Sequence, residues 1–268
     1  MAGASSQNVI PAWDGASYAA NTGHHRRHDT GFLDTLPLRP GDRLLDLGCG
    51  SGDFTSQLAQ RVPDGQVVGL DAEPSMLEQA RRIAGPNQSF VLGPAQRLAQ
   101  LCGPSGPFDA VTSRAMLHWV PAADHPGVLG AAASVLRTGG VLRLDAGGGD
   151  NVAAWRALLD PISTRVGGPA SPWTFFQPGE YLERLEQAGF SAAQGWVRLV
   201  AQRRPFDRAG VIGWLTSQVL HAYTARMPQP AVAGFTAEAL DRVDELRRDD
   251  GSYDVTFVRL DVLAHRGG

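Results

Sequence analysis

Short apolar runs alternate with segments of helical periodicity along the first half of the chain. The runs are rich in valine, leucine and phenylalanine, and they stand at residues 43–47, 66–70, 89–92, 108–112 and 140–145. Buried strands of a parallel sheet show such continuous apolar runs, and the helices between them cover both faces of the sheet. The pattern therefore predicts an α/β fold with strands at these places.

The spacing of apolar residues predicts helices between the runs. Phe54, Leu58 and Val62 recur four residues apart, which places them on one face of a helix. A similar apolar stripe runs through residues 178–190, and Gly189 stands where such a helix would stop.

Two further strands are predicted near the end of the chain, at residues 195–202 and 253–265. The stretch between them has mostly helical periodicity and is too long for a simple loop, so we interpret it as an inserted helical cap. The predicted organisation is a core at residues 43–202, the cap at 203–251 and a final core strand within 252–268.

The composition indicates a soluble globular protein. Of the 268 residues 43% are hydrophobic and 19% are charged, and the net charge is -3. The chain has no long basic run, no apolar stretch that could span a membrane, and no secretory signal at residues 1–15. We expect a cytoplasmic monomer or homodimer that binds neither nucleic acid nor membranes.

Metal binding is not expected either. Cys49 and Cys102 are the two cysteines, too few for a metal cluster, and a structural disulfide is not expected. His24 and His28 have the separation of two metal ligands on a helix, but two arginines lie between them and no glutamate is near.

The most informative stretch is "LLDLGCGSGDFT", which starts at Leu44. A strand that leads through Gly48, Gly50 and Gly52 into a helix forms a tight turn whose backbone can approach a ligand. The spacing departs from the G-x-G-x-x-G pattern of dinucleotide-binding proteins, because Asp53 stands where the third glycine would be. A nicotinamide-dependent oxidoreductase is therefore disfavoured.

Carboxylates around the turn indicate the charge of the ligand. Asp46 and Asp53 would repel a pyrophosphate and would attract a cation, such as a sulfonium with its ammonium group. Asp71 directly follows the second predicted strand, at the distance where an acid binds ribose hydroxyls in nucleotide-binding units.

These motifs resemble those of the class I S-adenosylmethionine-dependent methyltransferases. The resemblance rests on "LLDLGCGSG", "VVGLDAEPSMLEQAR", "FDAVTSRAMLHWV" and "VLRTGGVLRL". The stretches "AGGGDNV", "WTFFQPGEYLERLEQAGF" and "YDVTFVRLDVLA" resemble the subgroup that includes trans-aconitate methyltransferase. The resemblance spans residues 13–264 and implies a Rossmann-like seven-stranded sheet with its last strand antiparallel. It also implies a helical lid at residues 1–42.

The resemblance assigns roles to particular residues. Asp71 would bind the ribose, while Ala72 and Met76 would flank the adenine. The methionine part of S-adenosylmethionine would be held by Asp46, Gly48, Cys49, Gly50 and Gly52, with Ser113 and Arg114 beside it.

One position departs from the family pattern. Pro94 stands where the family usually has an acid that binds the adenine amino group. The resemblance then leaves Ala95 and Gln96 as the adenine contacts.

Methyl transfer needs a base only if the acceptor must lose a proton. His118 is the best-placed base, since an unperturbed imidazole has a pKa of about 6.5, and its alternative role is structural packing on Trp119. From the lid, Tyr18 could orient an acceptor hydroxyl and Trp13 could face the ligand. Trp119, Trp173 and Phe176 could wall an acceptor pocket.

The aromatic residues favour methylation of carbon, nitrogen or oxygen in an aromatic natural-product intermediate, such as an indole or a phenol. Arginines at positions 203, 204, 208 and 226 keep open the alternative of a carboxylate acceptor of the trans-aconitate type. A third hypothesis is a non-methylating protein that binds the cofactor as a sensor or promotes a cyclisation.

Overall fold

The structure is a computed structural model that describes residues 31–268. Trp13, Tyr18, His24 and His28 therefore lie outside the described residues, as does most of the predicted lid. The chain divides into two compact units. Within the described residues, the sheet unit comprises 31–151, 174–202 and 257–268, and the helical unit comprises 152–173 and 203–256.

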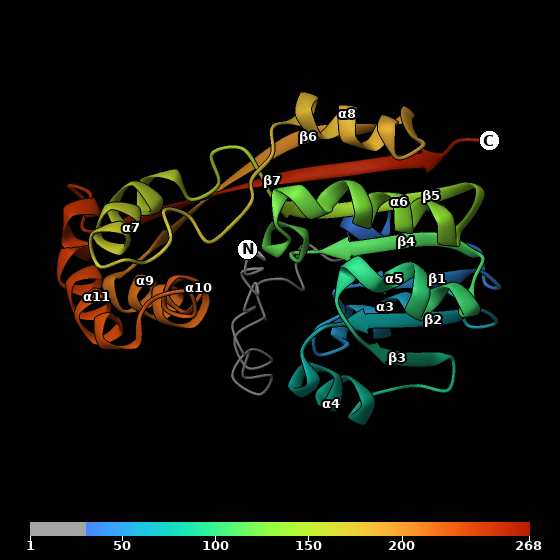
Figure 1. Ribbon diagram of the computed structural model, residues 1–268, viewed down its shortest axis with the longest axis horizontal. Coiled ribbons are helices and arrows are strands. Elements are labelled where there is room, and N and C mark those ends of the chain that lie inside the picture. Colours follow the sequence, from blue (N-terminus) through green and yellow to red (C-terminus); the bar gives the residue numbers. More distant parts are fainter. Residues whose placement is uncertain (1–30) are drawn as a thin grey trace, which may run out of the picture. The chain divides into compact units, whose positions relative to one another are not determined.

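A seven-stranded sheet has the order β3-β2-β1-β4-β5-β7-β6 (Figure 1). Neighbouring strands from β3 to β5 run parallel, whereas β7 pairs antiparallel with β5. This arrangement confirms the predicted fold class. In chain order the strands are β1 Arg43–Leu47, β2 Gln66–Asp71, β3 Gln88–Leu92, β4 Phe108–Arg114, β5 Leu136–Gly147, β6 Phe190–Phe206 and β7 Tyr253–Arg266.

The predicted strands are found, and the largest difference in the first five is at β5. This strand begins at Leu136, four residues before its predicted start at Gly140. Phe108 pairs with Leu136 while Ala110 pairs with Val141, so the register shifts there and several residues of β5 form a bulge. Gly139, with a φ of +72°, lies in this bulge. Two adjacent glycines are typical of a turn, but Gly139 and Gly140 belong to an irregular strand.

Helices and short helical turns pack against the sheet. Their buried apolar side chains form two clusters with those of the strands. Leu98, Leu129 and Leu185 belong to a cluster with the sheet residues Leu45, Val111 and Leu142. Leu58 and the segment 32–36 belong to another, with Leu44 and Val67, whose side chains alternate with those of the first cluster along the strands. The helices of this unit are α3 Asp53–Arg61, α4 Pro74–Arg82, α5 Leu98–Cys102, α6 His125–Val135 and α8 Pro178–Gln187.

The helical unit contains the segment that the sequence predicts as a cap. Trp155 packs edge-on against Trp214 at a ring separation of 5.6 Å, and Tyr223 packs against Phe235 at 5.5 Å. The unit also includes α7, which precedes the predicted cap in sequence. Its helices are α7 Ala153–Arg165, α9 Arg208–Trp214, the π-helical turn Leu215–Val219, α10 Leu220–Thr224 and α11 Gln229–Asp241.

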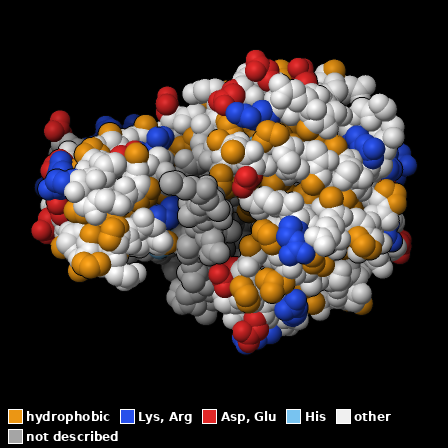
Figure 2. All heavy atoms as spheres, in the orientation of Figure 1, with side chains coloured by type: hydrophobic (Ala, Val, Ile, Leu, Met, Phe, Trp, Pro, Cys, Tyr) orange, Lys and Arg blue, Asp and Glu red, His pale blue; other side chains and the backbone are white. Residues whose placement is uncertain are grey.

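Surface charges are mixed on the face drawn in Figure 2. Blue arginine side chains are scattered among red acidic ones, with no continuous basic stripe among the coloured, described residues. No helix within residues 31–268 combines the length and the apolar character that crossing a membrane requires.

Candidate active site

The glycine turn between β1 and α3 is held by the neighbouring strand. The backbone amides of Gly48 and Cys49 both donate to the carbonyl oxygen of Leu70, at 2.7 and 3.1 Å. The φ angles of Gly48, Gly50 and Gly52 are +76°, +52° and +84°, a region that other residues rarely adopt. The sequence therefore uses glycine where the backbone requires it.

The three glycines differ in what surrounds them. A Cβ atom on Gly48 would lie 2.3 Å from Met116 Cγ, and one on Gly52 would lie 2.8 Å from Ala80 Cβ. Among residues 31–268, no atom lies within 4 Å of a Cβ placed on Gly50. Gly48 and Gly52 thus allow close packing within the protein, whereas none of the described residues crowds Gly50.

Asp46 is buried at the end of β1, with 1% of its surface exposed. The hydroxyl groups of Thr55 and Thr112 donate to its two carboxylate oxygens, at 2.7 and 3.2 Å. Burial raises the pKa of Asp46 to about 6, against these two hydrogen bonds, which lower it. A nearby cation would stabilise the ionised carboxylate.

Asp71 ties the end of β2 to the glycine turn. Its carboxylate accepts the amide of Gly50 at 2.8 Å through one oxygen and the amide of Glu73 at 2.9 Å through the other. Burial raises the pKa of Asp71. Each oxygen keeps a lone pair with which it can accept a ribose hydroxyl. Ala72, the next residue, is exposed, and Met76 is a buried residue of α4.

The predicted adenine side has an acid that the sequence analysis did not identify. Pro94 precedes a helical turn that contains the half-buried Ala95 and the exposed Gln96. The Gln96 amide donates from Nε2 to Asp124 Oδ2 at 2.8 Å. A carboxylate therefore lies beside Gln96, although it comes from a position 28 residues further along the chain.

Ser113 and Arg114 end β4. The Ser113 hydroxyl donates to the carbonyl oxygen of Leu47 at 2.8 Å and so connects β4 to the start of the glycine turn. The Arg114 guanidinium lies over the rings of Phe32 and Phe54, at 5.3 and 5.1 Å from their centroids. Its Nη2 is 3.7 Å from Asp145 Oδ2.

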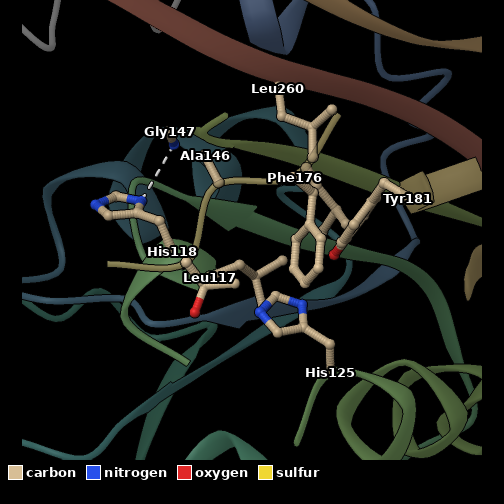
Figure 3. A pocket seen from close by; sticks show the side chains of 10 residues that line it. Leu117, His118, His125, Ala146, Gly147, Phe176, Tyr181 and Leu260 are labelled. Carbon is tan, nitrogen blue, oxygen red and sulfur yellow. Dashed lines mark hydrogen bonds between the residues drawn. The ribbon is translucent and has the colours of Figure 1, made fainter. Parts of the chain in front are cut away.

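His118 follows β4 and is fixed by the end of β5. The Gly147 amide donates to His118 Nδ1 at 3.2 Å (Figure 3). Burial, together with the charge of Arg259, lowers the pKa of His118 to about 3. The imidazole is therefore neutral near neutral pH, and because Nδ1 accepts a hydrogen bond its proton resides on Nε2.

Aromatic rings surround His118. The ring of Trp119 is 5.4 Å from the imidazole, and that of Phe175 is 6.1 Å away. Phe175 was not among the predicted site residues, although it precedes Phe176, which was. In Figure 3, Nε2 of His118 points away from the cavity around Phe176.

Phe176 and Trp173 contact aromatic residues other than His118. Phe176 is buried and packs against His125 and Tyr181, with ring separations of 4.7 and 5.3 Å. Trp173 belongs to the helical unit, where its ring meets that of Tyr223 edge-on at 5.6 Å. Their proposed contact with an acceptor stays a prediction.

Asp145 and Arg259 are charged residues near His118 that sequence reasoning did not select. The Arg259 Nε donates to Asp145 Oδ1 at 2.6 Å. Although burial raises it, the charges of Arg259 and Arg114 hold the pKa of Asp145 below its usual range. Asp145 ends a predicted strand and Arg259 interrupts an apolar one, but they are 114 residues apart, so neither position predicts the pair.

The sequence is similar to those of known proteins. Residues 44–140 match a family described as "Methyltransferase domain". A trans-aconitate 2-methyltransferase of Streptomyces coelicolor is 33% identical over 218 residues, which are 77% of this chain and 70% of the relative. A protein of the same name from Deinococcus radiodurans is 34% identical over 211 residues, which are 75% of this chain and 78% of the relative. The chain belongs to the class I S-adenosylmethionine-dependent methyltransferases, and is trans-aconitate methyltransferase-like.

The methyltransferase also shares its fold with solved structures. A putative methyltransferase from Bacillus halodurans superposes with a TM-score of 0.62 at 17% sequence identity, covering 90% of this chain and all of that one. The enzyme uses S-adenosylmethionine, and the described residues fit this cofactor. No described residue would obstruct a ligand at Gly50, and the carboxylates of Asp46 and Asp71 would suit its cationic and ribose parts.

Proposed function

We propose that this methyltransferase transfers a methyl group to a carboxylate oxygen of a small polycarboxylic acid of the trans-aconitate type. The names of the relatives from Streptomyces coelicolor and Deinococcus radiodurans support this acceptor. The observation that carries the proposal is the state of His118, which is neutral with its Nδ1 engaged.

The state of His118 bears on the acceptor because acceptors differ in whether they must lose a proton. A phenol has a pKa of about 10, so it needs a base at neutral pH, whereas a carboxylic acid with a pKa of about 4 is already ionised. An imidazole whose pKa is about 3 is a poor base near neutrality. A carboxylate acceptor therefore suits this site better than the phenol or indole favoured by the aromatic residues alone.

S-adenosylmethionine, when bound, supplies a methyl group whose bond to sulfur breaks as the new bond to the carboxylate oxygen forms. The protein holds the acceptor in line and excludes water. His118 donates a hydrogen bond from Nε2 to an acceptor oxygen, and the Gly147 amide keeps the imidazole in the required tautomer. Trp119 and Phe175 shield this hydrogen bond from water.

An acceptor screen tests the proposal. The purified enzyme would be incubated with S-adenosylmethionine and either trans-aconitate or a set of phenols and indoles, and S-adenosylhomocysteine and the methylated product would be measured by mass spectrometry. We expect a methyl ester from trans-aconitate. Turnover of a phenol or indole, without turnover of any polycarboxylate, would contradict the proposal.

The pH profile of kcat gives a second test. Because His118 stays neutral and a carboxylate acceptor carries no proton, we expect kcat to be level between about pH 6 and pH 9. A rise of tenfold per pH unit on the acid side of this range would instead indicate a base in the reaction.

A further inference from the structure

Arg259 is held at the end of the sheet by a single residue of the neighbouring strand. Its Nε donates to Asp145 Oδ1 at 2.6 Å, and its Nη2 donates to the backbone oxygen of Asp145 at 3.2 Å. One edge of the guanidinium is thus fixed. Nη1 makes no hydrogen bond to any of residues 31–268, and Nη2 keeps a second N–H, so the remaining edge can donate two hydrogen bonds.

The free edge of Arg259 carries positive charge in a partly buried place. The side chains of Arg259 and Asp145 are 24% and 16% exposed, so water screens the guanidinium only in part. Such a guanidinium edge attracts an anion.

The position of Arg259 relates it to His118. On the antiparallel strands, Arg259 is the register partner of Gly147, whose amide donates to His118. The next residue, Leu260, lies in the apolar cluster of the opposite sheet face, so Arg259 points to the same face as Asp145. Arg259 and His118 therefore both lie beside Gly147, at the carboxyl end of β5. Each of them has a hydrogen-bond donor to offer, the free edge of Arg259 and Nε2 of His118.

We propose that Arg259, positioned by Asp145, binds a carboxylate of the acceptor that is not methylated. This inference rests on the proposed function and identifies the residue that selects polycarboxylic acids. The two N–H groups of the free guanidinium edge match the two oxygens of a carboxylate.

The bound carboxylate is the non-reacting one because of how charge changes during transfer. The reacting carboxylate loses its negative charge as the ester forms. A guanidinium on that group would stabilise the starting complex more than the transition state, and would slow the reaction. On a second carboxylate, whose charge does not change, the same interaction stabilises both equally and lowers KM.

Arg259→Gln tests the inference, with Arg198→Gln as the matched control. Arg198 lies on β6, is 57% exposed and pairs with Asp261 of β7. The control therefore removes an equal charge at another place. We expect Arg259→Gln to raise KM for trans-aconitate by about tenfold to a hundredfold with a much smaller change in kcat. Arg259→Lys should recover part of the affinity, because it keeps the charge but not the planar edge.

Binding measurements separate this inference from the proposed function. Calorimetry with S-adenosylhomocysteine present would give the affinity of each variant for trans-aconitate, and titration with S-adenosylhomocysteine alone would show that the cofactor site is intact. If wild type binds and methylates trans-aconitate but Arg259→Gln is unchanged, the role of Arg259 is refuted and the proposed function stands. If wild type neither binds nor methylates a polycarboxylate, both fail. An equal loss of cofactor binding in Arg259→Gln and Arg259→Lys would show a structural role and overturn the inference.

Discussion

At the scale of single residues, the glycines of the turn serve different purposes although they share a backbone conformation. We expect Gly50→Ala to weaken S-adenosylmethionine binding at least about tenfold, with a stability loss of only about 1–2 kcal/mol from the positive φ. Gly52→Ala should lose more stability, because its Cβ would also press on the Ala80 backbone at 3.0 Å. Calorimetric titration and urea unfolding give the two quantities. Equal stability losses would contradict this distinction.

We expect Asp46 to make cofactor binding depend on pH. Its pKa in the folded protein is raised to about 6, whereas its pKa in the unfolded chain is about 4. Protonation of this group therefore stabilises the folded protein below pH 4, and this stabilisation is lost as the pH rises through 6. A bound sulfonium favours the carboxylate and lowers that pKa. We therefore expect affinity for S-adenosylmethionine to fall as pH drops from 6 to 5.

Calorimetric titration with S-adenosylmethionine at each pH measures this affinity. Two controls are a titration with S-adenosylhomocysteine, which lacks the sulfonium charge, and a titration of the Asp46→Asn variant with S-adenosylmethionine. Both should show a smaller pH dependence. Asp71, whose pKa is also raised, would account for any dependence that survives in Asp46→Asn. An unchanged pH dependence in this variant would refute the role of Asp46.

Tyr181 carries a buried hydroxyl that forms no hydrogen bond within the described residues. Its ring packs against Phe176 and His125 in the apolar cluster. Because an unsatisfied buried polar group costs about 1–3 kcal/mol, Tyr181→Phe should leave the free energy of unfolding unchanged or raise it. Urea unfolding measures this, and a loss above about 1 kcal/mol would show that the hydroxyl has a partner in solution.

At the scale of elements, a buried ion pair joins β5 and β7. Arg143 Nη1 is 2.5 Å from Asp261 Oδ1, and the other oxygen of Asp261 accepts from Trp196 and Arg198, at 2.8 and 2.9 Å. Asp261→Asn would leave Arg143 buried without its countercharge. We expect a loss of about 3–5 kcal/mol in the free energy of unfolding.

A surface pair provides the control for this measurement. Arg61 and Asp34 are 45% and 57% exposed, so Asp34→Asn should change stability by less than about 1 kcal/mol. Similar losses in Asp34→Asn and Asp261→Asn would contradict the importance of burial.

The strands show what local sequence determines. β1 has the predicted bounds because its apolar run is continuous and ends directly at glycine. The early start of β5 could not be predicted, since Gly139 and Gly140 have the local signature of a turn and the pairing of Leu136 with Phe108 is a long-range contact. Periodicity reports burial, and it does not report which partner lies opposite.

At the scale of the whole molecule, the sequence motifs predicted the fold and the glycine turn after β1, but they did not predict which distant residues pair with one another. Asp145 with Arg259 and Gln96 with Asp124 are examples, because only the folded sheet brings their strands and turns together. In the same way, the periodicity of residues 203–251 predicted helices but gave no sign that α7 belongs to the same compact unit.

The place of β7 also has a consequence for the order of folding. It is the last of the seven strands along the chain, yet it lies between β5 and β6. A chain synthesised from its N-terminus therefore exposes an unpaired edge of β5 until residues 253–266 have been made. The sheet can be completed only after these residues have been made, and until then an aggregating partner could occupy that edge.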